Sequence, residues 1–200
     1  TEATSSAINN KANIFFNYEE GAIQFAGKNA VAVEKYADSE AEEDFISVMS
    51  SSTGKIEKVG MREYVVGCVA AEMSALYHTE ALKAQAVACY TYAKKTCEQN
   101  GKHKDSSLGA ADITDSPDTH QGYLGKKQRK EKWGEKYDEY EAKITEAVDE
   151  VFGYYLSYDG ETALALYHAI SAGATQSAES MWGSVIPYLI SVESPGDKLS

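Results

Sequence analysis

The acidic residue Glu72 lies on a helical stripe that is otherwise apolar. The members of this stripe recur every three or four residues: Met61, Val65, Val69, Glu72 and Leu76. Burial of a carboxyl group disfavours its ionised form, and a general acid must carry its proton at neutral pH. Glu72 is therefore a candidate general acid. An alternative remains open on this pattern, in which Glu72 ends a helix with its head group in water or paired with Lys83.

Two histidines lie near other polar side chains. His120 follows three aspartates in the segment 112–118, but their spacing does not match a calcium loop, and one imidazole is too few for a structural zinc site. Turn-forming aspartates explain this pattern, and we interpret His120 as a polar residue of a cleft. His168 lies close to Ser171, as in a hydrolase dyad, but the segment 169–173 lacks the first glycine of a nucleophile elbow. Serine catalysis is therefore disfavoured.

The composition limits the classes of partner. The chain has 200 residues, 43% of them hydrophobic, and a formal net charge of −12. Nucleic-acid binding needs a basic footprint, so the charge argues against nucleic acid as a partner, and an anionic membrane surface is also a poor fit. Cys89 and Cys97 lie about 12 Å apart on one expected helix, too far to form a disulfide. We interpret these two thiols and Cys68 as buried apolar groups.

The helices and strands that must position these residues can be predicted from the spacing of the apolar residues, which changes along the chain. Strands are expected at Ala12–Asn17, Ala30–Lys35, Phe45–Met49, Lys55–Val59, Tyr154–Tyr158 and Thr162–Tyr167. Helices are expected over Met61–Leu76, Glu80–Thr96 and Lys126–Val151, and a polar surface loop over 101–116. We interpret the basic cluster Lys126–Lys132 as a solvated helix face. This order predicts an α+β fold of central helices packed with antiparallel strands, with a substrate cleft between them.

Several blocks of the sequence carry a family resemblance. They are Met61–Gly67, Ala70–Met73, Glu80–Ala88, Asp115–Tyr123, and Tyr167–Gly173 leading to Glu179, Trp182-Gly183 and Pro187–Leu189. In this order, from about residue 45 to 197, they resemble the stage II sporulation protein D family. The resemblance implies a catalytic domain over 45–200, expected to continue past Ser200, preceded by an N-terminal arm or small strand segment over 1–44.

The resemblance also implies an activity, that of a peptidoglycan lytic transglycosylase acting in engulfment during sporulation. Carried over residue by residue, the family's catalytic glutamate falls on Glu72 and its cleft lysine on Lys83. One carboxyl group would act as acid and then as base, leaving 1,6-anhydromuramyl ends on the glycan. The residues expected to bind substrate are Lys83, Tyr90, His120, Gln121, Tyr123, Tyr167, His168, Ser171, Gly173 and Thr175.

The sequence departs from the family pattern at two places. Tyr90 stands before Thr91-Tyr92 where the family usually has arginine, so one cationic substrate contact is lost or replaced. Some members hold zinc through cysteines around the motif that matches His120, but this chain has no cysteine after Cys97. We therefore expect no cofactor and no tight zinc site.

The resemblance leaves two functions to weigh. In the first, the chain cleaves glycan strands that have been stripped of their peptides. In the second, it is a non-catalytic module that binds the same glycan and enhances a partner cell-wall amidase. Both imply a location outside the cytoplasm, on the wall side of a bacterial membrane, with any signal or anchor segment outside this chain.

Overall fold

The computed structural model describes residues 16–17, 22–23, 31–36, 44–102, 105–168 and 171–194. The chain divides into two compact units. Unit 1 draws on the ranges 1–33, 157–161 and 167–200, and unit 2 on 34–156 and 162–166. The candidate acid and the candidate residues from 83 to 123 all belong to unit 2.

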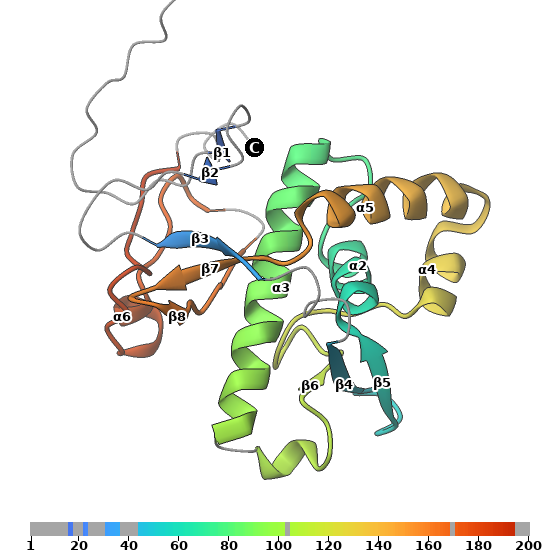
Figure 1. Cartoon of the computed structure of the whole chain (residues 1–200), viewed down its shortest axis with the longest axis horizontal. Coiled ribbons are helices and arrows are strands. Elements are labelled where there is room, and N and C mark those ends of the chain that lie inside the picture. Colours follow the sequence, from blue (N-terminus) through green and yellow to red (C-terminus); the bar gives the residue numbers. More distant parts are fainter. Residues whose placement is uncertain are drawn as a thin grey trace, which may run out of the picture. The chain divides into compact units, whose positions relative to one another are not determined.

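Unit 2 combines a small mixed sheet with packed helices (Figure 1). Its strands are β4 (Phe45–Met49), β5 (Ile56–Gly60) and β6 (Ile113–Thr114), in the order β5-β4-β6. Its helices are α2 (Met61–Glu72), α3 (Thr79–Lys102), α4 (Lys126–Trp133) and α5 (Tyr137–Val151), with short 3-10 turns at Ser106–Leu108 and Gly134–Lys136. Helices α2, α3 and α5 pack on one another and enclose the core. Mixed helices and sheets confirm the α+β prediction.

Helix α2 is enclosed on nearly every side. Each residue from Tyr64 to Ala70 is buried, and α2 contacts α3, α4 and α5 as well as the strands β4 and β5. A helix that is apolar all round is expected in a core rather than on a surface. Its C-terminal end therefore has a fixed position relative to the rest of unit 2.

The antiparallel hairpin at residues 45–60 confirms its prediction. Strand β4 pairs with β5 from Phe45 opposite Gly60 to Met49 opposite Ile56. Strand β6 pairs in parallel with β4 at Val48 and Met49, inside the segment predicted to be a polar loop. That part of the loop prediction is wrong, because a strand of two residues is too short to show a period.

Two helix predictions need correction. The helix expected over 126–151 is interrupted: Gly134 has φ +50°, which ends α4, and a 3-10 turn leads into α5. The helix expected to reach Leu76 ends at Glu72, and Leu76 is 76% exposed in the following turn. Periodicity alone could not locate either break, because apolar residues continue at helical spacing across both.

Three further strands form a second sheet. Strands β3 (Ala32–Lys35), β7 (Tyr154–Tyr158) and β8 (Glu161–Thr162) form a sheet in the order β3-β7-β8. Asp159 and Gly160 both have positive φ, 51° and 78°, as the predicted tight turn requires. Strand β8 is shorter than the predicted Thr162–Tyr167. The predicted strand Ala12–Asn17 lies mostly outside the described residues.

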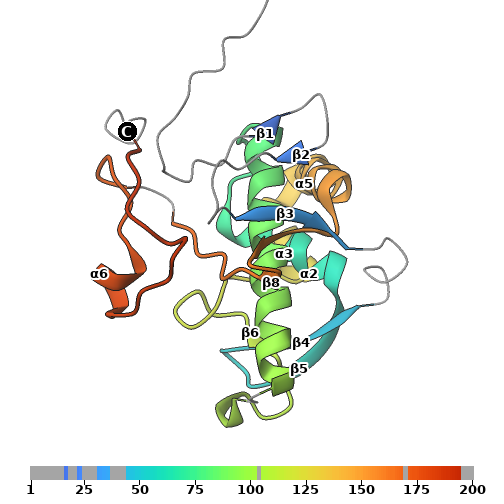
Figure 2. The same cartoon turned by 60° about the vertical axis from the view of Figure 1, so that its left-hand side comes forward.

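Unit 1 has little regular structure among its described residues. Strands β1 (Phe16–Asn17) and β2 (Ala22–Ile23) form an antiparallel pair. Helix α6 (Ala178–Trp182), which Figure 2 shows from a second direction, begins where the Ser177 hydroxyl accepts a hydrogen bond from the Ser180 N–H. In the part of the chain that the structure describes, no helix combines the length and apolarity needed to cross a membrane.

Candidate functional site

Glu72 is the last residue of α2. The chain leaves the helix immediately after it, because Met73 is extended with φ −126° and ψ 151°. Glu72 Oε1 accepts a hydrogen bond from the Gly122 N–H at 2.6 Å. The side chain is half-buried rather than enclosed, so the stripe position overstates its burial. The hydrogen bond fixes one carboxyl oxygen in place, and a backbone N–H can donate to that oxygen in either protonation state.

Gly122 makes this hydrogen bond possible because it has no side chain. A Cβ atom built at this position would lie 2.9 Å from Glu72 Oε1 and 3.2 Å from the Ala71 Cβ. Real Cβ atoms essentially never approach a neighbour as closely as the first of these distances. A side chain at position 122 would therefore displace the Glu72 carboxyl group, whereas glycine leaves that group in place.

The residues after Gly122 continue along α2. The Tyr123 ring stacks on the Tyr64 ring, with centroids 5.2 Å apart and an interplanar angle of 18°. The Leu124 N–H donates to Gly67 O at 3.2 Å, and a Cβ at Gly67 would lie 2.7 Å from Leu124 O. The segment 122–124 is thus bound to α2 at three successive residues, and it holds the hydrogen-bond donor for Glu72.

The residues before Gly122 connect the same segment to α3 and β6. Gln121 is 2% exposed, and its Nε2 donates to Cys89 O at 3.1 Å and to the Tyr64 hydroxyl at 3.3 Å. The half-buried His120 accepts a long hydrogen bond at Nδ1 from the Thr114 N–H, 3.5 Å away. An acceptor at Nδ1 corresponds to a neutral ring, in agreement with burial, which lowers the pKa of His120.

Lys83 and Tyr90 lie in the interior of unit 2. The Lys83 ammonium, 5% exposed, binds Glu150 at 2.5 Å and Glu80 at 3.0 Å, and the hydrogen bond that it donates to Glu150 raises its pKa. Tyr90 is 2% exposed and packs edge-on against Phe152, and burial raises its pKa. These environments account for both residues as parts of the core. Their roles in substrate binding stay predictions.

The comparisons with known proteins address the family of the chain. The family model for stage II sporulation protein, SpoIID, matches residues 49–158. The chain belongs to the SpoIID family. Stage II sporulation protein D of Bacillus subtilis is 37% identical over 155 residues, which cover 78% of this chain and 44% of that protein. The same figures hold for stage II sporulation protein D of Bacillus amyloliquefaciens.

A more distant relative comes from another organism. An uncharacterised protein of Brachyspira hyodysenteriae is 31% identical over 134 residues, or 67% of this chain and 32% of that protein. The chain therefore spans less than half the length of the curated Bacillus relatives it matches.

The remaining predicted site residues of this SpoIID chain belong to unit 1. They are Tyr167, His168, Ser171, Gly173 and Thr175. Within that unit, the Gly173 N–H donates to the Ser171 hydroxyl at 3.3 Å, and the Thr175 hydroxyl accepts from the Val192 N–H at 2.9 Å. His168 is exposed. Their place in a groove with Glu72, and the substrate cleft itself, stay predictions.

A hollow elsewhere in unit 2 does not involve the predicted site residues. It measures about 820 Å³ and is lined by one side of α5: Asp138, Glu141, Ala142, Thr145, Glu146, Asp149 and Glu150. Within the described ranges, no three His, Cys, Asp or Glu side chains gather closely enough to hold a metal ion.

Sequence reasoning missed Arg129, which lies in the cluster interpreted as a solvated face. The side chain of Arg129 is fully buried, so this interpretation is wrong at that position. A signal was present, because Arg129 precedes Trp133 and Tyr137 at steps of four and so lies on the apolar stripe of the predicted helix.

Proposed function

We propose that this SpoIID chain is a lytic transglycosylase. In this proposal it cleaves peptidoglycan glycan strands, stripped of their peptides, between N-acetylmuramic acid and N-acetylglucosamine. The observation that carries the proposal is the half-buried Glu72 carboxyl group, fixed by the Gly122 N–H at the end of a buried helix. A general acid must be both accessible to substrate and held in one orientation, and this carboxyl group meets both requirements.

One carboxyl group suffices for the proposed reaction. Protonated Glu72 gives its proton to the glycosidic oxygen as the bond from that oxygen to C1 of the muramic sugar breaks. The resulting carboxylate takes the proton of the C6 hydroxyl group, whose oxygen bonds to C1 and closes the 1,6-anhydro ring. Glu72 regains its proton and no water is consumed. A hydrolase would ordinarily need a second carboxylate to activate water or attack the sugar.

The surroundings of Glu72 are compatible with a sugar substrate. A glycan without its peptides carries little charge, so the net charge of −12 does not oppose binding. The half-buried Tyr123 ring lies one residue from the Gly122 donor. Sugar C–H faces pack on aromatic rings while their hydroxyl groups bind polar edges, so Tyr123 is a suitable contact in this proposal.

The test uses glycan strands freed of their peptides and mass spectrometry of the products. The native chain should produce 1,6-anhydromuramyl ends, and Glu72→Gln should produce none while keeping its circular dichroism spectrum and melting temperature. Glu139→Gln is the matched control, because Glu139 is exposed on α5 and its ion pair with Lys136 lies at the surface. Products with reducing ends would identify hydrolysis and refute the single-carboxylate mechanism.

The second candidate is a glycan-binding enhancer of a cell-wall amidase. Tyr90 favours it, since an aromatic residue in the core of unit 2 replaces the arginine usual in the family. Under this alternative, the native chain and Glu72→Gln would bind glycan equally and neither would release anhydro products. In either case, we propose that the chain acts on the wall side of a bacterial membrane during engulfment.

A further inference from the structure

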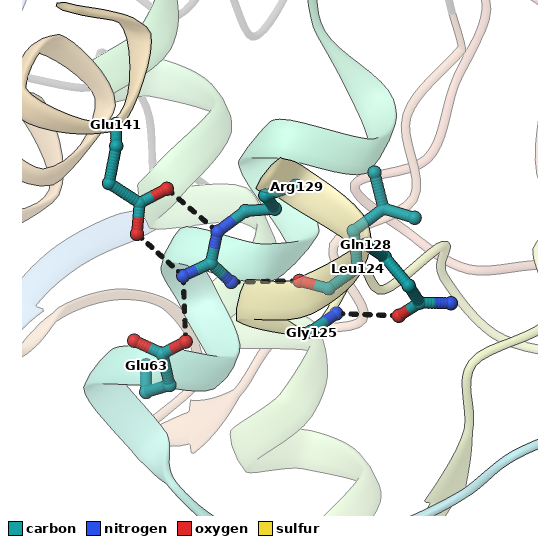
Figure 3. A network of polar contacts seen from close by, with 6 residues as sticks. All are labelled: Glu63, Leu124, Gly125, Gln128, Arg129 and Glu141. Carbon is teal, nitrogen blue, oxygen red and sulfur yellow. Dashed lines mark hydrogen bonds and ion pairs between the residues drawn. The ribbon is translucent and has the colours of Figure 1, made fainter. Parts of the chain in front are cut away.

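The guanidinium group of Arg129 joins three parts of unit 2 (Figure 3). Its Nε and Nη2 donate to the two carboxyl oxygens of Glu141 on α5, at 2.8 and 2.7 Å. Nη2 also donates to Glu63 on α2 at 2.7 Å, and Nη1 donates to Leu124 O at 2.8 Å. The side chain is 0% exposed. Arg129 thus binds two helices and the loop that precedes α4 at once.

The contacts of Arg129 are better suited to orienting a backbone group than to stabilising the fold. Removing a guanidinium group and its partners from water costs free energy that the ion pairs offset only when their geometry is good. Here the planar guanidinium group donates hydrogen bonds from more than one edge. Its bidentate contact with Glu141 fixes the plane of the group. The Nη1 donor is then aimed at one backbone carbonyl group. A lysine ammonium, with its rotating donors, could not fix that direction.

The carbonyl group that Arg129 holds is two residues from the donor to Glu72. Leu124 O accepts from Arg129, the Leu124 N–H donates to Gly67 O, and the Gly122 N–H donates to Glu72 Oε1. The next residue, Gly125, begins the approach to α4, where its O accepts from the Arg129 N–H at 3.0 Å. The segment 122–125 therefore lies between α2 on one side and Arg129 on the other.

We infer that Arg129 is a positioning residue for Glu72. It holds the Leu124 carbonyl group in place, and through the two intervening peptide units it keeps the Gly122 N–H directed at the Glu72 carboxyl group. Its effect on turnover rests on the proposed function, whereas its effect on the Gly122 hydrogen bond does not.

The test compares Arg129→Lys with a matched control in the full chain. Arg62→Lys is suitable because Arg62 also joins α2 to α5 by a bidentate pair, to Asp149 at 2.6 and 2.7 Å, but is 45% exposed at its side chain. The first readout is the amide resonance of Gly122 in a nitrogen–proton NMR spectrum. A short hydrogen bond to a carboxyl group shifts that proton downfield, and its chemical shift then changes when Glu72 gains or loses its proton. The part of the pH response that disappears in Glu72→Gln is the part due to Glu72.

The expected result is specific to the segment 122–125. Arg129→Lys should move the Gly122 amide proton upfield and weaken its response to pH, while Arg62→Lys leaves both unchanged. In turnover of peptide-free glycan, Arg129→Lys should lower kcat about 10- to 100-fold with KM changed less than about threefold, since a misplacement near 1 Å can cost that much. Arg62→Lys should keep native kcat.

Two outcomes would overturn the inference. One is a folded Arg129→Lys variant with the native Gly122 resonance and pH response. The other is an equal change in Arg62→Lys, which would indicate a general effect on packing. If Arg129→Lys does not fold, Glu141→Gln decides, because it removes the bidentate contact that fixes the plane of the guanidinium group. Glu141→Gln should move the Gly122 resonance in the same direction, and an unchanged resonance refutes the inference. A native chain without turnover, but with a Gly122 resonance that responds to Arg129, refutes the proposed function alone.

Discussion

Substitution of Gly122 by alanine tests the close approach that holds Glu72. The new Cβ would lie 2.9 Å from Glu72 Oε1, about 0.5 Å short of the 3.4 Å at which ordinary contact begins. Either the carboxyl group or the loop must move by that amount. Because the new Cβ meets the far end of a flexible side chain, the shift costs only about 1 kcal/mol, the low end of overpacking, and lowers Tm by roughly 2–4 °C in a chain of this size. If 1 Å of misplacement costs about 100-fold, a 0.5 Å shift should lower kcat about tenfold.

The assay measures turnover of peptide-free glycan and thermal unfolding for Gly122→Ala and for Gly101→Ala. Gly101 lies in α3, where an added Cβ meets nothing within 4 Å, so its substitution should keep native kcat and leave Tm unchanged or slightly raised. Native kcat and native Tm in Gly122→Ala would refute the reasoning, because the loop would then have room for a side chain beside Glu72.

Two further predictions concern titrating groups. Burial lowers the pKa of His120, so the unfolded chain binds more protons below the ordinary histidine value of about 6.5, and Tm should fall as the pH decreases from 7.5 to 5. His120→Gln should flatten that slope, and an unchanged slope would contradict this account. Burial also raises the pKa of Cys97 to about 12 and that of Cys68 well above its ordinary value. A disulfide reagent at pH 8 should therefore react slowly with the folded chain and count three thiols in denaturant. Cys68 and Cys89 are buried as predicted, whereas Cys97 is half-buried, and rapid native reaction would contradict this account.

Much of the local structure of unit 2 could be predicted from the sequence. Alternating apolar residues on either side of a polar, glycine-containing loop fix the hairpin at 45–60, and both signals are local. The break at Gly134 depends on a positive φ that a periodic pattern does not report. Strand β6 depends on a partner far away in the sequence, because Ile113 and Thr114 pair with Val48 and Met49.

The candidate site, too, could be predicted only in part from the sequence. Glu72 could be selected because its stripe is local to one helix. Its partner could not, since the Gly122 N–H lies 50 residues away and is a backbone group that every residue except proline carries. The burial of Arg129 also depends on distant partners, as its carboxylates come from α2 and α5 and its carbonyl group from the loop.

The position of Glu72 is unusual for a glutamate that serves only to stabilise a helix. The C-terminal end of a helix carries partial negative charge, where an ionised acid costs about 0.3–1 kcal/mol, and the last turn of α2 has no basic residue of its own. Lysines from other helices supply the positive charge instead. The Lys132 ammonium binds Ala70 O at 2.8 Å, and that of Lys143 binds Ala75 O and Tyr77 O at 2.8 and 2.7 Å. Glu72 is thus held at an electrostatically unfavourable helix end by the Gly122 N–H, while α4 and α5 supply the compensating positive charge, and this arrangement is consistent with the catalytic role proposed for it.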